Sequence, residues 1–213
     1  DYAAGDFEEN FRLPMGTLPD VLMSDGQRLF MRSVAFDLDL HRQPGSPALQ
    51  VPAGFLDDSY FKRTPWRHSG DYGRVIVQDG KSVYYVRMFD SLKALDPNVF
   101  FTPGKEGYLL FGKDLQGSRK TWMGRLPVRV RAMVLAGGRL FVAGPPDRVD
   151  FDDPLGAFEG REGGKLCVFD AGSGELLRQV DLPAPPVFNG MAAAAGRLIL
   201  ADVAGGILTL GVE

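Results

Sequence analysis

The amino-acid sequence predicts an all-β fold built from short antiparallel strands. The first observation behind this prediction is backbone composition, because the 213 residues include 27 Gly and 15 Pro, which favours many turns between short elements. The second is a hairpin pattern that recurs four times. The third is the scarcity of helical periodicity, since only residues 90–95 have the composition of a short capped helix.

Each recurring unit is an apolar stretch, a Gly-containing turn and a second short apolar strand. Glycine supplies the positive φ angles that tight β-hairpins need. The spacings between units are 54, 57 and 58 residues, counted from 29 to 83, 83 to 140 and 140 to 198 on the first apolar residue after each turn: Leu29, Val83, Leu140 and Leu198. We therefore expect four repeats, at about 14–66, 67–123, 124–182 and 183–213.

The third repeat indicates what one unit contains. Its hairpin is followed by a long loop, a strand at 164–170, a turn at 171–174 and a strand at 175–182. Four antiparallel strands per repeat is the content of a β-propeller blade. The sequence thus predicts a single β-propeller domain or half-propeller over residues 1–213, with about four blades.

Charge and cysteine content exclude several classes of function. With 24 Lys and Arg against 27 Asp and Glu, the net charge is −3, which gives no support to a nucleic-acid-binding surface. Cys167 is the single cysteine, so an intrachain disulfide and a Cys-rich zinc site are excluded, and we expect it to be buried. The most apolar stretch, 191–210, contains Arg197 and Asp202, and no membrane span is expected.

One segment concentrates side chains that suit a polar ligand. Carboxylates, guanidinium groups, aromatic rings and a histidine occur within twelve residues, and such groups grip sugar rings or carboxylates. The alternative, which we favour, is a long loop folded on itself, with Asp–Arg pairs and a Trp packed between blades. The candidate ligand-binding residues are Asp57, Asp58, Tyr60, Arg63, Trp66, Arg67 and His68.

An acidic loop later in the chain is a candidate calcium site, formed by Asp150, Asp152 and Asp153. Calcium prefers six to eight oxygen ligands. The EF-hand register fails, however, because Arg161 stands where the loop needs Glu and Leu155 where it needs Gly. We favour a solvated loop whose aspartates cap turns.

Several segments resemble the PQQ-like (quinoprotein-type) β-propeller repeat proteins of bacteria, and in particular the C-terminal portion of large secreted ones. The stretches that carry the resemblance are 53–66, 141–147, 169–177 (FDAGSGELL), 183–191 and 194–201 (AAGRLILA). The resemblance covers about residues 18–211 and implies a ring of six to eight blades and an extracytoplasmic location, periplasmic or secreted. The adjacent cysteines of quinoprotein dehydrogenases are absent, and the only tryptophans are Trp66 and Trp122. We therefore interpret the resemblance as one of fold.

These observations favour a non-catalytic binding or scaffold module that presents rim loops to a ligand or protein partner, with no cofactor. The alternative is a divergent quinoprotein-type oxidoreductase, or a carbohydrate-acting propeller enzyme. PQQ or Ca²⁺ would serve such an enzyme, and carboxylates such as Asp57, Asp58 or Asp150 would have to converge on the central channel.

The last repeat stops after three strands, at residues 206–210. The fourth strand could come from the N-terminal segment 7–13, which would close a four-bladed ring. We favour the larger ring that the resemblance implies, completed by another chain or by the remaining part of the same polypeptide.

Overall fold

The computed structural model describes residues 22–24, 27–31, 34–44, 49–50, 66–68, 71–73, 75–87, 108–115, 117 and 119–211. Contacts group the chain into two compact units, Asp1–Gly73 and Arg74–Glu213, and each unit is described by itself. The expected all-β fold is confirmed, because the described elements are antiparallel strands with one short helix. No helix in these described ranges is long and apolar enough to cross a membrane.

The described residues of the first unit form two small antiparallel sheets. One has the order β1 (Leu22–Ser24), β2 (Leu29–Met31), β3 (Val34–Phe36) and β4 (Arg42–Gln43). The other has the order β5 (Leu49–Gln50), β6 (Trp66–His68) and β7 (Asp71–Gly73). The first predicted hairpin is present as β1 and β2, whereas β6 crosses the position 66/67 at which we expected one repeat to end and the next to begin.

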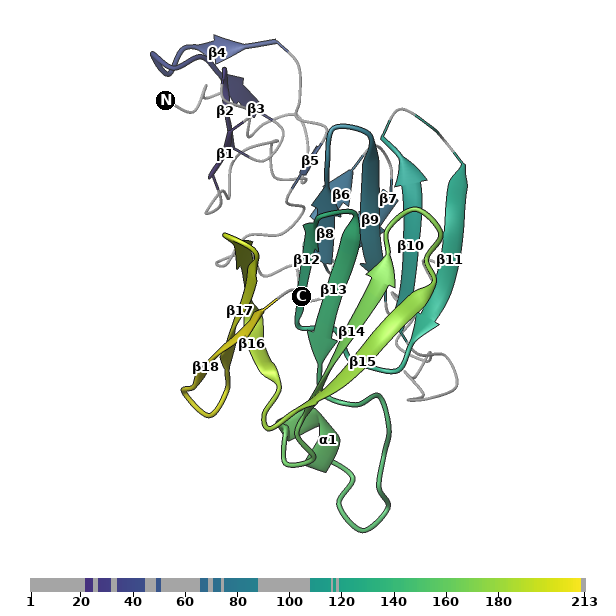
Figure 1. Cartoon of the computed structure of the whole chain (residues 1–213). Helices are drawn as coiled ribbons and strands as arrows, with labels where there is room; N and C mark the ends of the chain where they lie inside the picture. The colour runs from purple at the N-terminus through teal and green to yellow at the C-terminus, as the bar shows by residue number, and fades with distance from the viewer. Residues whose placement is uncertain are drawn as a thin grey trace. The chain divides into compact units, whose positions relative to one another are not determined.

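The described residues of the second unit form three antiparallel sheets in which neighbouring strands follow one another along the chain (Figure 1). The first sheet is β8 (Val75–Gln78), β9 (Ser82–Arg87), β10 (Tyr108–Asp114) and β11 (Lys120–Leu126). The second is β12 (Ala132–Ala136), β13 (Arg139–Gly144), β14 (Gly164–Asp170) and β15 (Leu176–Leu182). The third has only β16 (Pro186–Ala194), β17 (Arg197–Asp202) and β18 (Ile207–Gly211). The short helix α1 (Gly156–Glu159) lies in the loop between β13 and β14.

The hairpins of the second unit form where the sequence predicts them. The β12–β13 turn places Gly137 and Gly138 at φ angles of 57° and 72°, a conformation that glycine adopts without strain. Strand β14 has the predicted bounds, and β15 begins one residue later than expected. Composition and turn chemistry therefore determine the strand pairs of these repeats.

The second sheet is buried on both faces. Leu140, Val142 and Cys167 belong to one apolar core, together with side chains from the first sheet such as Val86 and Leu110. The alternate residues of the same strands form a second core with residues of the third sheet: Phe141, Ala143, Leu166, Val168, Leu198 and Leu200. The expected burial of Cys167 is confirmed, and burial raises the pKa of its thiol to about 11.

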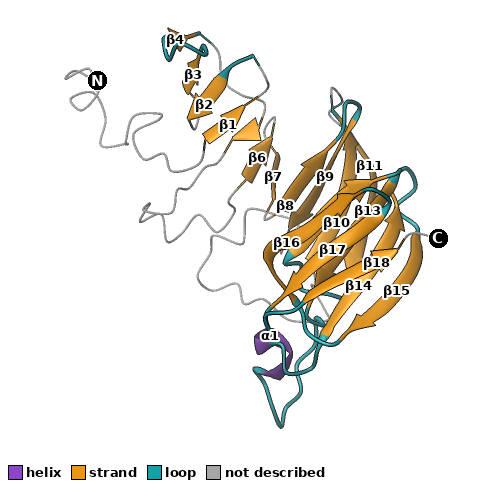
Figure 2. Cartoon of the chain, turned by 60° about the vertical axis from the view of Figure 1, so that its left-hand side comes forward, coloured by secondary structure: helices purple, strands orange, loops and turns teal. Residues whose placement is uncertain are grey.

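The three sheets are also joined through their first strands and through one tryptophan. Strand β12 contacts both β8 and β16, so the first strands of consecutive sheets lie side by side (Figures 1 and 2). Trp122 of β11 donates a hydrogen bond from Nε1 to the carbonyl of Ala171 at 2.9 Å. Gly174, at φ 74°, leaves room for this indole, because a Cβ there would lie 2.5 Å from the ring. The tryptophan thus fastens the first sheet to the β14–β15 turn.

We predict that Gly144→Ala destabilises the protein while Gly124→Ala does not. A Cβ at Gly144 would lie 1.9 Å from the backbone oxygen of Arg129, whereas the space around Gly124 is empty. Overpacking of this kind costs about 1–3 kcal/mol. Urea unfolding followed by circular dichroism measures the difference. Equal free energies of unfolding for the two variants would contradict the packing described here.

Candidate functional site

The predicted ligand-binding segment lies mostly outside the described residues. Asp57, Asp58, Tyr60 and Arg63 fall outside them. The backbone of Trp66, Arg67 and His68 forms β6, the central strand of its sheet, paired with β5 on one side and β7 on the other. The structure does not test the ligand-binding hypothesis for this segment, which therefore stays a prediction.

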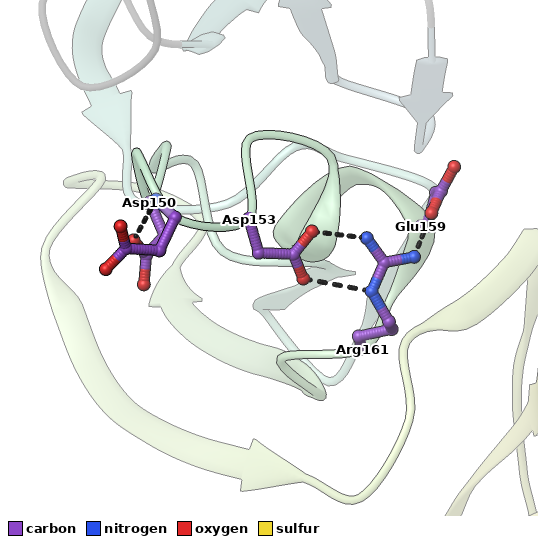
Figure 3. Close-up of polar contacts among 5 residues, drawn as sticks. Asp150, Asp153, Glu159 and Arg161 are labelled. Atoms are coloured by element: carbon purple, nitrogen blue, oxygen red, sulfur yellow. Dashed lines mark hydrogen bonds and ion pairs between the residues drawn. The ribbon is translucent and has the colours of Figure 1, made fainter.

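In the acidic loop, the structure gives one of the proposed calcium ligands a different partner. Arg161 donates from Nε to Asp153 Oδ2 at 3.0 Å and from Nη2 to Asp153 Oδ1 at 2.5 Å, and it also pairs with Glu159 (Figure 3). The guanidinium group lowers the pKa of Asp153 and has its own pKa raised. Asp150 accepts the backbone N–H of Asp152 at 2.9 Å, as in an Asx turn. These contacts are those of a loop held by its own charges, and the calcium hypothesis stays a prediction.

A buried ion pair anchors the start of this loop to the segment that precedes β12. Arg129 Nε lies 3.2 Å from Asp147 Oδ1, and the Asp147 side chain is only 1% exposed. The guanidinium carbon of Arg129 also lies 5.6 Å from the centre of the Phe158 ring. Arg131 donates to the Phe158 carbonyl at 2.6 Å. Arg129 and Arg131, which directly precede β12, are thus structural contacts of the loop.

Among the described residues, three side chains approach one another at a spacing that suits a metal ion, Asp37, Asp39 and His41. Asp37 accepts hydrogen bonds from the backbone N–H of His41 at 2.8 Å and of Asp39 at 3.1 Å. Its second oxygen accepts Gln43 Nε2 at 2.8 Å. These bonds lower the pKa of Asp37, with the His41 bond as the largest cause. The cluster is accounted for by the turn between β3 and β4.

Two neighbouring cavities lie between the second and third sheets. One cavity of about 730 Å³ is lined by Phe141 of β13, Val168 of β14 and Val180 of β15, and on the other side by Leu210 of β18. A second cavity of about 480 Å³ shares Phe141 and extends along the β12–β13 and β16–β17 turns. We call the two cavities together the groove. It extends along β15, the fourth strand of the second sheet; the third sheet has no fourth strand among the described residues.

Three arginines border the groove and have no carboxylate partner among the described residues. Arg139 lines both cavities, Arg178 lines the larger one and Arg197 the smaller one. None of the three forms an ion pair or a side-chain hydrogen bond with another described residue, whereas Arg129, Arg148 and Arg161 all do. Arg139 and Arg178 share a face of the sheet with Phe141, because Phe141 pairs with Val168 and Val168 with Arg178. An apolar floor with unpaired guanidinium groups can bind an anionic, partly apolar ligand.

Strand β18, which borders the groove, has one side open in the part of the chain that the structure describes. Asp202 N–H donates to the Gly206 carbonyl at 3.0 Å, which fixes the alternation of bonded and non-bonded pairs along the hairpin. By that alternation, the backbone N–H and C=O groups of Ile207, Thr209 and Gly211 point away from β17. The strand carries no charged residue and no proline, the usual protection of an edge.

The outer face of the third sheet is also uncovered. Ile207 is 76% exposed and Ile199 is 38% exposed, and the alanines at 192 and 194 on the same face are exposed as well. The expected three-stranded end of the last repeat is therefore present, and it leaves an apolar face, an open edge and a groove.

The sequence predicted the absence of a fourth strand but not the groove arginines, because the face that these arginines share depends on cross-strand register. The pattern of Arg139 and Phe141 two residues apart was the available signal.

We predict that acidification releases the Asp153–Arg161 pair. The pKa of Asp153 is lowered from its ordinary value of 3.8 by the Arg161 hydrogen bonds, so the pair stabilises the loop above that value. Its contribution is lost as the pH falls through the lowered pKa. The Arg161 Nε resonance, followed by NMR from about pH 6 to about pH 2, reports the release.

Asp153→Asn should weaken this pH dependence, since the Glu159 contact of Arg161 remains, and Asp150→Asn, which lies outside the ion pair, should retain it in full. An unchanged titration of the Arg161 resonance in Asp153→Asn would contradict the assignment.

Comparison with known proteins does not assign the chain to a family. No protein-family model matches the chain. No match was found among curated proteins. The function is therefore inferred from the stacked sheets, the groove and the open edge.

Proposed function

We propose that this chain is a non-catalytic β-propeller module for binding or scaffolding, completed by another chain or by the remaining part of its own polypeptide. Consecutive four-stranded meanders that stack face to face, with their first strands side by side, are the arrangement of neighbouring propeller blades. The observation that carries the proposal is the exposure of the third sheet. Its outer face and its β18 edge are uncovered among the described residues, as they are in a blade that lacks its successor.

The energetics of the third sheet favour a partner. Full burial of an Ile side chain contributes about 1.5–3 kcal/mol, and Ile199 and Ile207 both retain exposed surface. Open apolar edges also lead to unwanted association, which native proteins normally prevent with charge or proline. A partner sheet removes both liabilities at once.

The described carboxylates support a binding role over catalysis. Asp147, Asp153 and Glu162 each lie against an arginine: Arg129, Arg161 and Arg148, respectively. Such pairs hold loops in place, and each of these carboxylates faces a guanidinium group instead of a ligand site. An enzyme would need carboxylates that converge on a common ligand. The resemblance to PQQ-like repeat proteins adds an extracytoplasmic setting to the proposal.

We predict that the isolated protein self-associates through the third sheet. Ile199→Lys together with Ile207→Lys places charge on the exposed face and should lower the sedimentation coefficient at high protein concentration. Leu155→Lys is the control, since Leu155 is 56% exposed but lies in the β13–β14 loop. Sedimentation velocity over a concentration series measures the effect. Equal behaviour of the double variant and the wild-type protein would count against an uncovered docking face.

We predict no stoichiometric binding of PQQ, with or without added Ca²⁺. The absorbance of the quinone, followed while purified protein is titrated into it, should show dilution only. Saturation at one PQQ per chain would overturn the non-catalytic proposal and favour the quinoprotein-type alternative.

A further inference from the structure

We propose that the groove and the β18 edge bind an extended acidic strand from a partner polypeptide, which adds to the third sheet as its fourth strand. The inference rests on the proposed function and deepens it, because it gives the chemistry of the segment that completes the sheet. Strand addition of this kind draws affinity from backbone hydrogen bonds and specificity from alternate side chains.

The position of the groove matches that of a missing strand. The second core is formed by Phe141 of β13 and Leu198 of β17, and by Leu166 of β14 and Leu210 of β18. The third sheet thus shares a core with the second, and Val180 and Leu182 at the end of β15 belong to that core. Among the described residues the third sheet has no fourth strand to cover the exposed first part of β15. The larger cavity is lined by Leu177, Arg178 and Val180 of β15. Its volume is about 730 Å³, which leaves room for side chains of an incoming strand to enter from the β18 edge.

Backbone geometry favours a strand over a small molecule as the occupant. The N–H and C=O groups of Ile207, Thr209 and Gly211 are directed to the open side of β18, in the register set by its pairing with β17. The other outer edges of the second unit are protected: β11 carries Lys120 and Arg125, and β15 carries Arg178 and Asp181. Strand β18, with the sequence ILTLG, has no such protection.

Charge complementarity selects an acidic strand. Arg139 and Arg178 lie on the groove face and form no ion pair with a described carboxylate. Val180 follows Arg178 by two residues on the same strand face. An incoming strand above β15 therefore meets a guanidinium group and an apolar side chain in alternation. The complementary pattern has inward-facing residues that alternate between Glu or Asp and Val, with one outward-facing residue between them.

The test uses a synthetic peptide of this pattern. A fluorescein-labelled ten-residue peptide, in which Glu and Val alternate at every second position with Thr between them, is titrated with the full chain and followed by fluorescence anisotropy. Saturable binding is expected, and it should weaken as salt rises. Arg178→Glu should weaken it by about tenfold or more, and Arg139→Glu in the same direction. Arg119→Glu is the matched control, because Arg119 is exposed in the β10–β11 loop of the first sheet.

A charge-swapped peptide separates a direct contact from loss of fold. The same peptide with Lys in place of Glu should fail to bind the wild-type protein and should bind Arg178→Glu. Thr209→Pro removes an outward-directed N–H from β18 and should weaken both complexes, while circular dichroism reports whether the sheet is retained. Hydrogen exchange locates the site: the amides of Ile207 and Thr209 should slow on peptide binding.

Other occupants give distinct results, and each overturns the proposal. Peptide binding that appears only in a full-length variant with Glu8→Lys and Glu9→Lys identifies the chain's own acidic N-terminal segment. Self-association that Thr209→Pro abolishes, but that Ile199→Lys together with Ile207→Lys leaves unchanged, identifies a second copy paired edge to edge. No binding of either peptide, or equal weakening by Arg119→Glu, excludes an acidic strand. The self-association and PQQ experiments above do not involve Arg178, so they can support the proposed function even where peptide binding fails.

Discussion

The burial of both faces of the β12–β15 sheet is the constraint on which the rest of the second unit depends. Leu140 and Val142 pack against the first sheet, while Phe141 and Ala143 between them pack against the third. Apolar pattern alone cannot fix the register of such a strand, because a one-residue slip exchanges two apolar faces. Turn geometry must fix it, through the positive φ angles of Gly137 and Gly138 and through Asp170, which accepts Ser173 N–H at 2.8 Å.

In a stack of sheets built in this way, the last sheet has no neighbour to cover its outer face. Each sheet needs a neighbour on both faces, and the third has one only on the side of Leu198 and Leu200 among the described residues. Because the third sheet has three described strands instead of four, the edge of β18 is open as well as the outer face of the sheet. Both features arise from the same repetition that buries Val142 and Cys167 completely. The groove is therefore a consequence of how the core is built.

The sequence predicted what is local and missed what depends on register. Gly turns and apolar runs predicted the hairpins of the second unit, and the three-stranded final repeat was also expected. The small β5–β7 sheet had no periodic signal, since β5 has two residues and β6 has three. Arg161 is instructive: it broke the calcium-loop register in the sequence, and the structure makes it the partner of Asp153 across eight residues of loop. Only folding brings those two charges together, and only cross-strand pairing places Arg139 and Arg178 on one face.

The net charge of the chain is negative, whereas the groove is lined by positively charged arginines. The distance of each charge from the groove decides which of them affects binding of an acidic segment. The whole chain carries a charge of −3, so at long range it weakly repels an acidic segment. At physiological ionic strength, charges more than about 8 Å away are largely screened. A strand seated in the groove lies within that distance of Arg139 and Arg178, while Asp147 and Asp153 are already neutralised by arginines of their own. Among the described residues, the guanidinium groups without ion-pair partners therefore contribute most to the electrostatics of the groove, and the net negative charge of the chain does not oppose an acidic partner there.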